Sequence, residues 1–255
     1  DKTGAVVIEP VYDEALDFAE GLAAVRKGHY STGRWGFIDR EGKTVIGFTF
    51  EKVRSFSEGR AAFEESGQGK GLLNSAWGFI DREGKKITDS AYLEAGDFPN
   101  GLAPVRVKTL FGNYIEWGYI DRSGKTAIRA KYASAGSFSE GLAPCLIENL
   151  FGMAGYTSIY IDVQGNTVVT APESRNPFCE GLAAMTTKNK YGGQVQGYVN
   201  RSGAFAFEPK YEYQDVGNFS EGLALVRMKD RTSGCIDRTG KTVIAFTTGA
   251  KKEFS

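Results

Sequence analysis

Few residues of this 255-residue sequence have the type and spacing that catalysis requires. Its single histidine, His29, lies in a polar stretch beside Tyr30. A histidine that acts as a general base needs a partner group within hydrogen-bonding reach, and the sequence places none near His29. We therefore expect no histidine-based catalytic or metal site, and we predict that the protein is not an enzyme.

Acidic and glycine-rich motifs give little support for a bound cofactor or metal. The motif D-x-x-G recurs, but each copy brings one aspartate, mostly followed by a basic residue, whereas calcium-binding β-repeats bring an aspartate round every few residues. Segment 67–71, GQGKG, lacks the Ser or Thr and the helix of a phosphate-binding loop. Cys145, Cys179 and Cys235 show no metal-ligand spacing, and we interpret them as free thiols while leaving a Cys145–Cys179 disulfide open. No cofactor is expected.

The composition is that of a folded protein without a charge preference for one kind of partner. Apolar residues make up 41% of the chain, and 31 Lys and Arg balance 31 Asp and Glu. Balanced charge gives no reason to expect a nucleic-acid partner, and no apolar run approaches the roughly 18 residues of a membrane-spanning helix. We expect neither nucleic-acid binding nor membrane insertion, and cysteine usage leaves the compartment open.

A repeat of about 40 residues extends over the whole chain. Its first motif is D-x-x-G, with Asn for Asp in one copy, at residues 1–4, 39–42, 81–84, 121–124, 162–165, 200–203 and 237–240. Its second motif is F-x-[E/N]-G, and the final glycines of successive copies are 38, 42, 40, 40 and 41 residues apart. Such regularity predicts a tandem-repeat protein in which neighbouring repeats supply the core that one repeat lacks.

Each motif can be interpreted as part of a β-structure. Side chains alternate along W-G-F-I-D at Trp35–Asp39, as a strand requires. The aspartate can then accept hydrogen bonds from backbone N–H groups, and the glycine of D-x-x-G supplies the positive φ of a hairpin turn. F-x-E-G marks a second turn, and an apolar run such as Leu22–Val25 follows it. One repeat is therefore predicted to contain three short strands and two tight turns.

The nonapeptide WGFIDREGK stands unchanged at residues 35–43 and 77–85, and a related copy begins at Trp117. With the F-S-E-G-L-A segments that follow, it resembles the WG repeat family of bacterial proteins over essentially the whole chain. The last three repeats replace the tryptophan by Ser158, Gln196 and Ser233. The resemblance implies a binding or scaffolding role in general terms, without a common ligand or reaction.

We expect residues 1–255 to form a single array of six repeats and a partial seventh, and to be a segment of a longer protein. The chain ends about seventeen residues out of phase with its start, whereas a closed propeller returns to its starting phase so that its first and last strands can share a blade. This mismatch favours an all-β open twisted solenoid or superhelical ribbon of stacked three-stranded repeats. A closed β-propeller is the alternative.

Recognition is expected in the loops that join the third strand of one repeat to the W-G strand of the next, because repeat proteins place variable insertions at their binding face. Two of these loops carry Leu-Phe-Gly in register, forty residues apart. They would present paired apolar tips to a partner, although folding back onto the sheet is the alternative. The candidate partner-binding residues are Leu110, Phe111, Leu150, Phe151, His29, Tyr30 and Tyr191.

These observations favour a non-enzymatic scaffold that recognises a protein partner, as the recognition or spacer module of a larger bacterial protein. A glycan-binding or cell-envelope module that uses exposed aromatic residues is the alternative, and an enzyme ranks last. We interpret Trp35, Trp77 and Trp117, and the phenylalanine of F-x-E-G, as core residues, because an aromatic that recurs once per repeat usually packs between neighbours.

Overall fold

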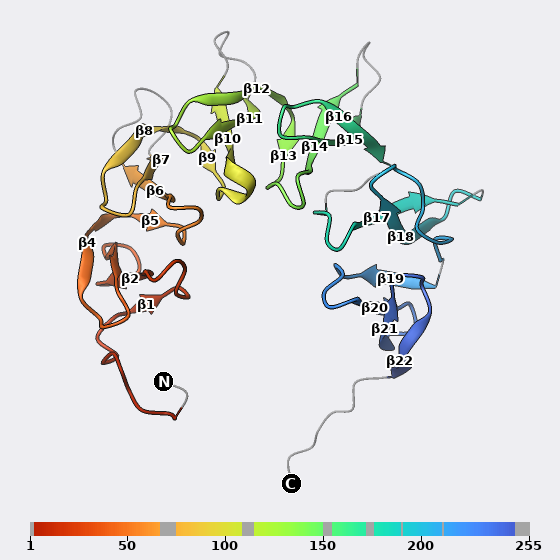
Figure 1. Ribbon diagram of the computed structural model, residues 1–255, viewed down its shortest axis with the longest axis horizontal. Helices are drawn as coiled ribbons and strands as arrows, with labels where there is room; N and C mark the ends of the chain where they lie inside the picture. Colours follow the sequence, from red (N-terminus) through yellow and green to blue (C-terminus); the bar gives the residue numbers. More distant parts are fainter. Residues whose placement is uncertain are drawn as a thin grey trace. The chain divides into compact units, whose positions relative to one another are not determined.

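The computed structural model describes residues 3–66, 75–108, 115–149, 155–171, 176–189, 191–210 and 212–247 (Figure 1). These residues form β-strands, turns and a single 3₁₀ turn, with no α-helix among them. The chain divides into two compact units, residues 1–131 and 132–255. Each unit is described by itself.

Three four-stranded sheets, here called repeats 1 to 3, build the N-terminal unit, and their strands follow the chain order. Repeat 1 contains β1 (Glu14–Ala15), β2 (Ala23–Lys27), β3 (Arg34–Ile38) and β4 (Thr44–Phe50). Repeat 2 contains β5 (Lys52–Val53), β6 (Ala61–Ser66), β7 (Ser75–Ile80) and β8 (Lys86–Tyr92). Repeat 3 contains β9 (Glu94–Ala95), the 3₁₀ turn η1 (Pro99–Gly101), β10 (Leu102–Lys108), β11 (Ile115–Asp121) and β12 (Thr126–Tyr132).

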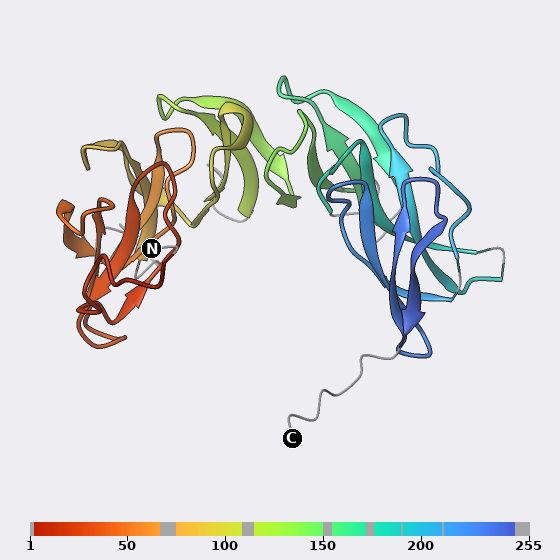
Figure 2. The same ribbon diagram turned by 60° about the horizontal axis from the view of Figure 1, so that its bottom comes forward.

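The C-terminal unit contains repeats 4 to 6. Repeat 4 is the sheet of β13 (Ser134–Ala135), β14 (Ala143–Glu148), β15 (Tyr156–Ile161) and β16 (Thr167–Ala171). Repeat 5 has two strands, β17 (Leu182–Lys188) and β18 (Gln194–Asn200). Repeat 6 is the sheet of β19 (Tyr213–Val216), β20 (Leu223–Met228), β21 (Ser233–Asp237) and β22 (Thr242–Thr247), blue in Figure 2.

The expectation of three strands per repeat is wrong for five of the six sheets, which have four. The additional strand lies just before F-x-E-G and is short: in repeat 1 it is Glu14–Ala15, paired antiparallel with Arg26 and Val25. Two residues are too few for a visible alternation of polar and apolar side chains. The repeat itself, its length and its all-β character are as expected, and no sheet closes on itself within the described residues.

The D-x-x-G hairpin turn is confirmed. The Gly42 N–H donates to the Asp39 carbonyl at 3.0 Å, and Asp39 Oδ1 accepts from the N–H groups of Glu41 at 3.1 Å and Lys43 at 2.8 Å. Gly42 has a φ of 82°, which favours glycine. In repeat 5 the amide oxygen of Asn200 accepts the same pair of bonds, so the turn needs an acceptor and not a charge.

The glycine of the W-G motif is required by the strand that follows the hairpin. Trp35 pairs with Phe50 and Phe37 with Ile46, so β4 bulges opposite Gly36. The bulge brings the Ile46 carbonyl so close that a Cβ on Gly36 would lie 2.6 Å from its oxygen. The motif therefore combines a packing residue with a position where only hydrogen fits.

The hydrophobic core lies between consecutive sheets. The aromatic residue after W-G packs its ring against the phenylalanine of the next F-x-E-G, with ring centroids 4.7 to 5.0 Å apart, in the pairs Phe37–Phe56, Phe79–Phe98, Tyr160–Phe178 and Tyr198–Phe219. These phenylalanines are buried, whereas Phe18 of repeat 1 is 42% exposed. Of the tryptophans, Trp35 is buried in the core between repeats 1 and 2, and Trp77 and Trp117 are half-buried.

The glutamate of F-x-E-G links neighbouring repeats within each unit. It adopts a positive φ of about 50°, a strained conformation for a non-glycine residue. Its carboxylate accepts a hydrogen bond of 2.9 Å from a glycine N–H in the next F-x-E-G, in the pairs Glu20–Gly59, Glu140–Gly181 and Glu180–Gly222. Glu58 instead pairs with Arg122, from the D-x-x-G turn of the next repeat. The motif therefore fixes the position of one sheet on the next.

Candidate functional site

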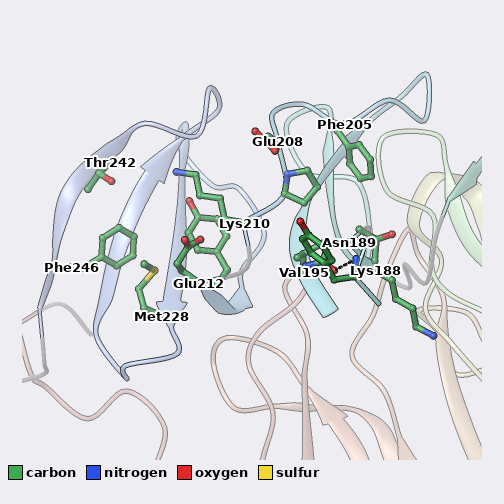
Figure 3. A pocket seen from close by; sticks show the side chains of 14 residues that line it. Lys188, Asn189, Val195, Phe205, Glu208, Lys210, Glu212, Met228, Thr242 and Phe246 are labelled. Carbon is green, nitrogen blue, oxygen red and sulfur yellow. Dashed lines mark hydrogen bonds between the residues drawn. The ribbon is translucent and has the colours of Figure 1, made fainter. Parts of the chain in front are cut away.

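A groove of about 1120 Å³ opens in the C-terminal unit between the β17–β18 hairpin and the sheet of repeat 6 (Figure 3). Its apolar lining includes Val195, Tyr213, Met228 and Phe246, of which Val195 and Tyr213 are buried. Figure 3 shows Met228, Thr242 and Phe246 on one wall and Val195, Lys188 and Asn189 on the other. A volume of this size accommodates several side chains of a bound segment.

An irregular segment takes the place of the fourth strand in repeat 5 and borders the groove. Residues 204–210 follow the D-x-x-G-like turn, where other repeats have a strand of five to seven residues. Two isolated bridges, Gln196 to Lys210 and Val199 to Phe205, and a hydrogen bond of 2.9 Å from the Ala206 N–H to the Tyr198 carbonyl hold this segment at the edge of β18. Pro209 has no N–H to donate to a ladder. The segment thus contributes side chains, Phe205 among them, to the lining of the groove.

The rim of the groove is charged and aromatic. Lys188, Glu208, Lys210 and Glu212 are exposed around it, and none of them forms an ion pair within the described part of the chain. The Lys210 ammonium lies 5.5 Å from the centre of the Tyr213 ring. The rim thus offers charges of both signs to a partner.

The structure places the sequence-predicted residues in different surroundings. Tyr191 is 83% exposed and lines the groove, and its N–H donates to Asn189 Oδ1 at 2.9 Å. His29 and Tyr30 are exposed in the N-terminal unit, where the two rings pack with centroids 4.4 Å apart and His29 Nδ1 lies 3.0 Å from Ser31 Oγ. The remaining predictions, Leu110, Phe111, Leu150 and Phe151, lie outside the described residues and stay predictions.

Most residues of the groove were missed by the sequence analysis. Phe205, Met228 and Phe246 belong to strand-like segments, and the sequence did not single them out as site residues. The available signal was Pro209, which interrupts the segment where the returning strand should continue. A proline at that position predicts an irregular edge segment.

The described part of the chain contains neither a cluster of metal-ligating side chains nor a disulfide. No three His, Cys, Asp or Glu side chains there gather as metal ligands, and Cys145, Cys179 and Cys235 are free thiols. Burial, together with the charges of Glu140 and Glu180, raises the pKa of the Cys179 thiol, which keeps it protonated and weakly nucleophilic at neutral pH. No helix in the described ranges is long and apolar enough to cross a membrane.

The sequence profile of the WG containing repeat matches this chain at residues 1–28, 35–68, 77–108, 117–150 and 197–231, together well over half of its length. The chain belongs to the WG repeat family. The longest stretch without a match, residues 151–196, contains β15, β16 and β17. A search of curated proteins found no match.

Solved structures with a similar fold include β-propellers. A eukaryotic initiation factor is 10% identical with a TM-score of 0.62, covering 92% of this chain and 65% of its own. The β-propeller domain of the Trilobed protease from Pyrococcus furiosus, described as having an open velcro topology, is 10% identical with a TM-score of 0.56, covering 92% and 84%. Structures from a study of two prolyl endopeptidases are 11% identical with a TM-score of 0.54, covering 88% and 40%. At such low identity the similarity concerns the fold alone.

Proposed function

We propose that this WG-repeat chain is a non-catalytic binding module whose C-terminal groove holds a segment of a protein partner. The observation that carries the proposal is the groove itself, which is bordered by the irregular segment 204–210 of repeat 5 and combines an apolar lining with a charged rim. Membership of a tandem-repeat family supports a binding role.

The lining of the groove indicates what kind of segment it accepts. Apolar side chains of a partner would bury against Met228 and Phe246, and this burial would supply most of the binding free energy. Lys188 and Lys210 would attract carboxylates, and Glu208 and Glu212 would attract basic groups, which sets the orientation more than the affinity. The expected ligand is a peptide segment with an apolar centre and charges of both signs on either side.

Peptide selection on the full chain tests this proposal. Peptides displayed on phage are selected on the wild-type protein, and their dissociation constants are measured for the double variant Tyr191→Ser and Phe205→Ser. These side chains are 83% and 46% exposed, so removing them should leave the fold intact. We expect at least a tenfold loss of affinity, about 1.4 kcal/mol.

The matched control is Leu225→Ser in β20 of repeat 6. It removes an apolar side chain that is 61% exposed and lies outside the groove. It should bind the selected peptides as the wild type does. Equal affinity of the double variant and the control would refute the groove as the binding site, as would the recovery of no binding peptide at all.

The arrangement of the six repeats is a separate part of the proposal. An open ribbon was expected from the sequence, and the similarity to a propeller domain supports the closed alternative equally. Small-angle X-ray scattering of the full chain separates the two, because an extended ribbon has a larger radius of gyration than a propeller of the same mass.

A further inference from the structure

A second cavity, of about 500 Å³, lies on the opposite face of the β17–β18 hairpin from the groove, between repeats 4 and 5. Because side chains alternate along a strand, Thr187 and Val195 face the groove while Thr186, Gln194 and Gln196 line this second cavity. Tyr156, Ser158 and Asn176 complete its polar lining. The two cavities share no lining residue.

Among the residues that the structure describes, no charged side chain lines the second cavity, and the polar groups there are hydroxyls and carboxamides. The Thr186 hydroxyl donates to Gln196 Oε1 at 3.1 Å, and the Asn176 amide donates to the Ala184 carbonyl at 3.0 Å. These bonds hold three of the lining side chains in place. Each carboxamide can still donate and accept further hydrogen bonds.

Ser158 is the most informative residue of the cavity. It is only 6% exposed, and its hydroxyl has no hydrogen-bond partner among the residues that the structure describes. Its oxygen is not among the polar side-chain atoms that are shut off from solvent without a partner, so it is accessible from the cavity and can bond to a ligand. Tyr156 is 60% exposed at the same cavity, and its hydroxyl and the Gln194 carboxamide also lack partners within the described ranges.

The corresponding positions of the N-terminal unit have different chemistry. Trp35 stands where Ser158 stands and is buried in the core. A cavity of about 430 Å³ does border Trp77, the counterpart of Gln196, but Lys52, Arg54 and Asp97 line it and the Arg54 guanidinium lies 5.8 Å from the indole. An uncharged lining is therefore not a general property of the repeat.

We infer that the second cavity binds a neutral saccharide unit. Its hydroxyls and carboxamides match the alternating donors and acceptors of sugar hydroxyl groups, and an exposed tyrosine ring offers a face for the C–H groups of a pyranose. A charged ligand would lose hydration here without meeting an opposite charge on the described lining residues. A volume of about 500 Å³ suits one or two sugar rings. This inference does not depend on the groove.

Saturation-transfer NMR on the full chain tests the inference, with maltose and cellobiose as probes and glucuronic acid and glucosamine as charged comparisons. We expect a signal from at least one neutral disaccharide and none from the charged sugars. Titration of the corresponding hexasaccharide distinguishes the source of the ligand: equal affinity indicates a free or terminal sugar, tighter binding indicates a chain, and either supports the site.

Two variants locate the binding. Ser158→Trp fills the cavity with the side chain that repeats 1 to 3 carry at this position, and it should abolish the signal. Gln196→Ala removes a carboxamide from the lining and should weaken binding at least tenfold. Their matched controls are Ser233→Trp, the same change at the same position of repeat 6, and Gln164→Ala, an exposed glutamine outside the cavity. Both controls should bind as the wild type does.

The inference is overturned if no neutral disaccharide gives a signal, if the charged sugars bind equally well, or if Gln196→Ala and Gln164→Ala have the same affinity. If Ser158→Trp fails to fold by near-UV circular dichroism, Gln196→Ala alone decides, since it removes only a partly exposed side chain.

Discussion

Trp35 of repeat 1 and Ser158 of repeat 4 occupy the same position of the W-G strand, and both are buried. The indole of Trp35 fills the space between repeats 1 and 2 with apolar surface. The hydroxymethyl group of Ser158 instead borders a polar cavity between repeats 4 and 5. The turns and the contacts between repeats are alike in the two regions. The backbone of the repeat therefore accommodates either an indole or a polar cavity between neighbouring repeats.

The largest loss of stability is expected at the aromatic pairs that pack between neighbouring repeats. Phe178 is fully buried and packs against Tyr160 with ring centroids 4.7 Å apart. Phe178→Ala should lower the free energy of unfolding by about 3–5 kcal/mol, measured by urea denaturation with circular dichroism. Phe18→Ala is the matched control at the same motif position, and its 42% exposure predicts a loss of about 1 kcal/mol or less. Equal losses would show that the ring contact between repeats is not what holds them together.

The next largest loss of stability is expected for replacement of the buried tryptophan, Trp35. Trp35 is 8% exposed within the core of repeats 1 and 2. Trp35→Ser should cost about 3 kcal/mol, because it leaves a cavity lined by apolar side chains together with a hydroxyl. Urea denaturation followed by the fluorescence of Trp77 and Trp117 reports on the same unit. A loss below about 1 kcal/mol would mean that the N-terminal unit tolerates a cavity as the C-terminal unit does.

A smaller loss of stability is expected when the glycine of the W-G motif is replaced. Gly36→Ala would place a Cβ 2.6 Å from the Ile46 carbonyl oxygen, and relieving this clash should cost about 1–3 kcal/mol. Gly47→Ala lies in the same bulge with no atom within 4 Å of the added Cβ, so it should change the stability by less than about 1 kcal/mol. Thermal unfolding of the two variants compares them directly. If Gly47→Ala were the more harmful change, the bulge would not explain the motif.

A smaller effect is expected at the hairpin turns, and it depends on pH. The hydrogen bond from the Asn166 side chain, with backbone N–H groups, lowers the pKa of Asp162 below its ordinary value of 3.8. A carboxylate with a lowered pKa in the folded state stabilises the fold above its unfolded pKa, and this contribution is lost as the pH falls through the folded pKa.

Asp162→Asn should therefore be close to wild type at pH 7, because Asn200 forms the same turn. Its stability should fall less than that of the wild type when the pH is lowered from about 5 to 3, as measured by urea denaturation at each pH. Parallel pH profiles would contradict the assignment of part of the acid sensitivity to this turn.

Much of the framework could be predicted from the sequence, because it depends on local chemistry. D-x-x-G makes its own hydrogen bonds within five residues, as at Asp39, and the phenylalanine of F-x-E-G recurs with the period of the stack. The two-residue strands, such as β1, could not be predicted because they carry no pattern. The positive φ of Glu20 was also missed, since it belongs to a two-residue turn, closed by the Ala19 and Leu22 backbone groups, in which both central residues have a positive φ.

The candidate site was predictable only in part. Tyr191 was found because it lies in a variable loop, whereas Phe205 and Phe246 were hidden in segments that look like ordinary strands. The groove borders an irregular segment of repeat 5 that replaces a regular fourth strand, and the polar cavity borders a serine where repeats 1 to 3 have a tryptophan. The consequence of such a replacement depends on how the neighbouring residues relax, and a single sequence does not reveal that.

The stability of Ser158→Trp tests most directly whether the backbone of the repeat accepts different side chains between neighbouring repeats. The cavity beside Ser158 has a volume of about 500 Å³, and the same position holds a tryptophan in three other repeats. We predict that the free energy of unfolding, measured with urea, stays within about 1 kcal/mol of wild type and that the near-UV spectrum remains native. Trp35→Ser, in contrast, is expected to lose stability. A loss of 3 kcal/mol or more would contradict the account, because it would show that repeat 4 is packed around serine as tightly as repeat 1 is around tryptophan.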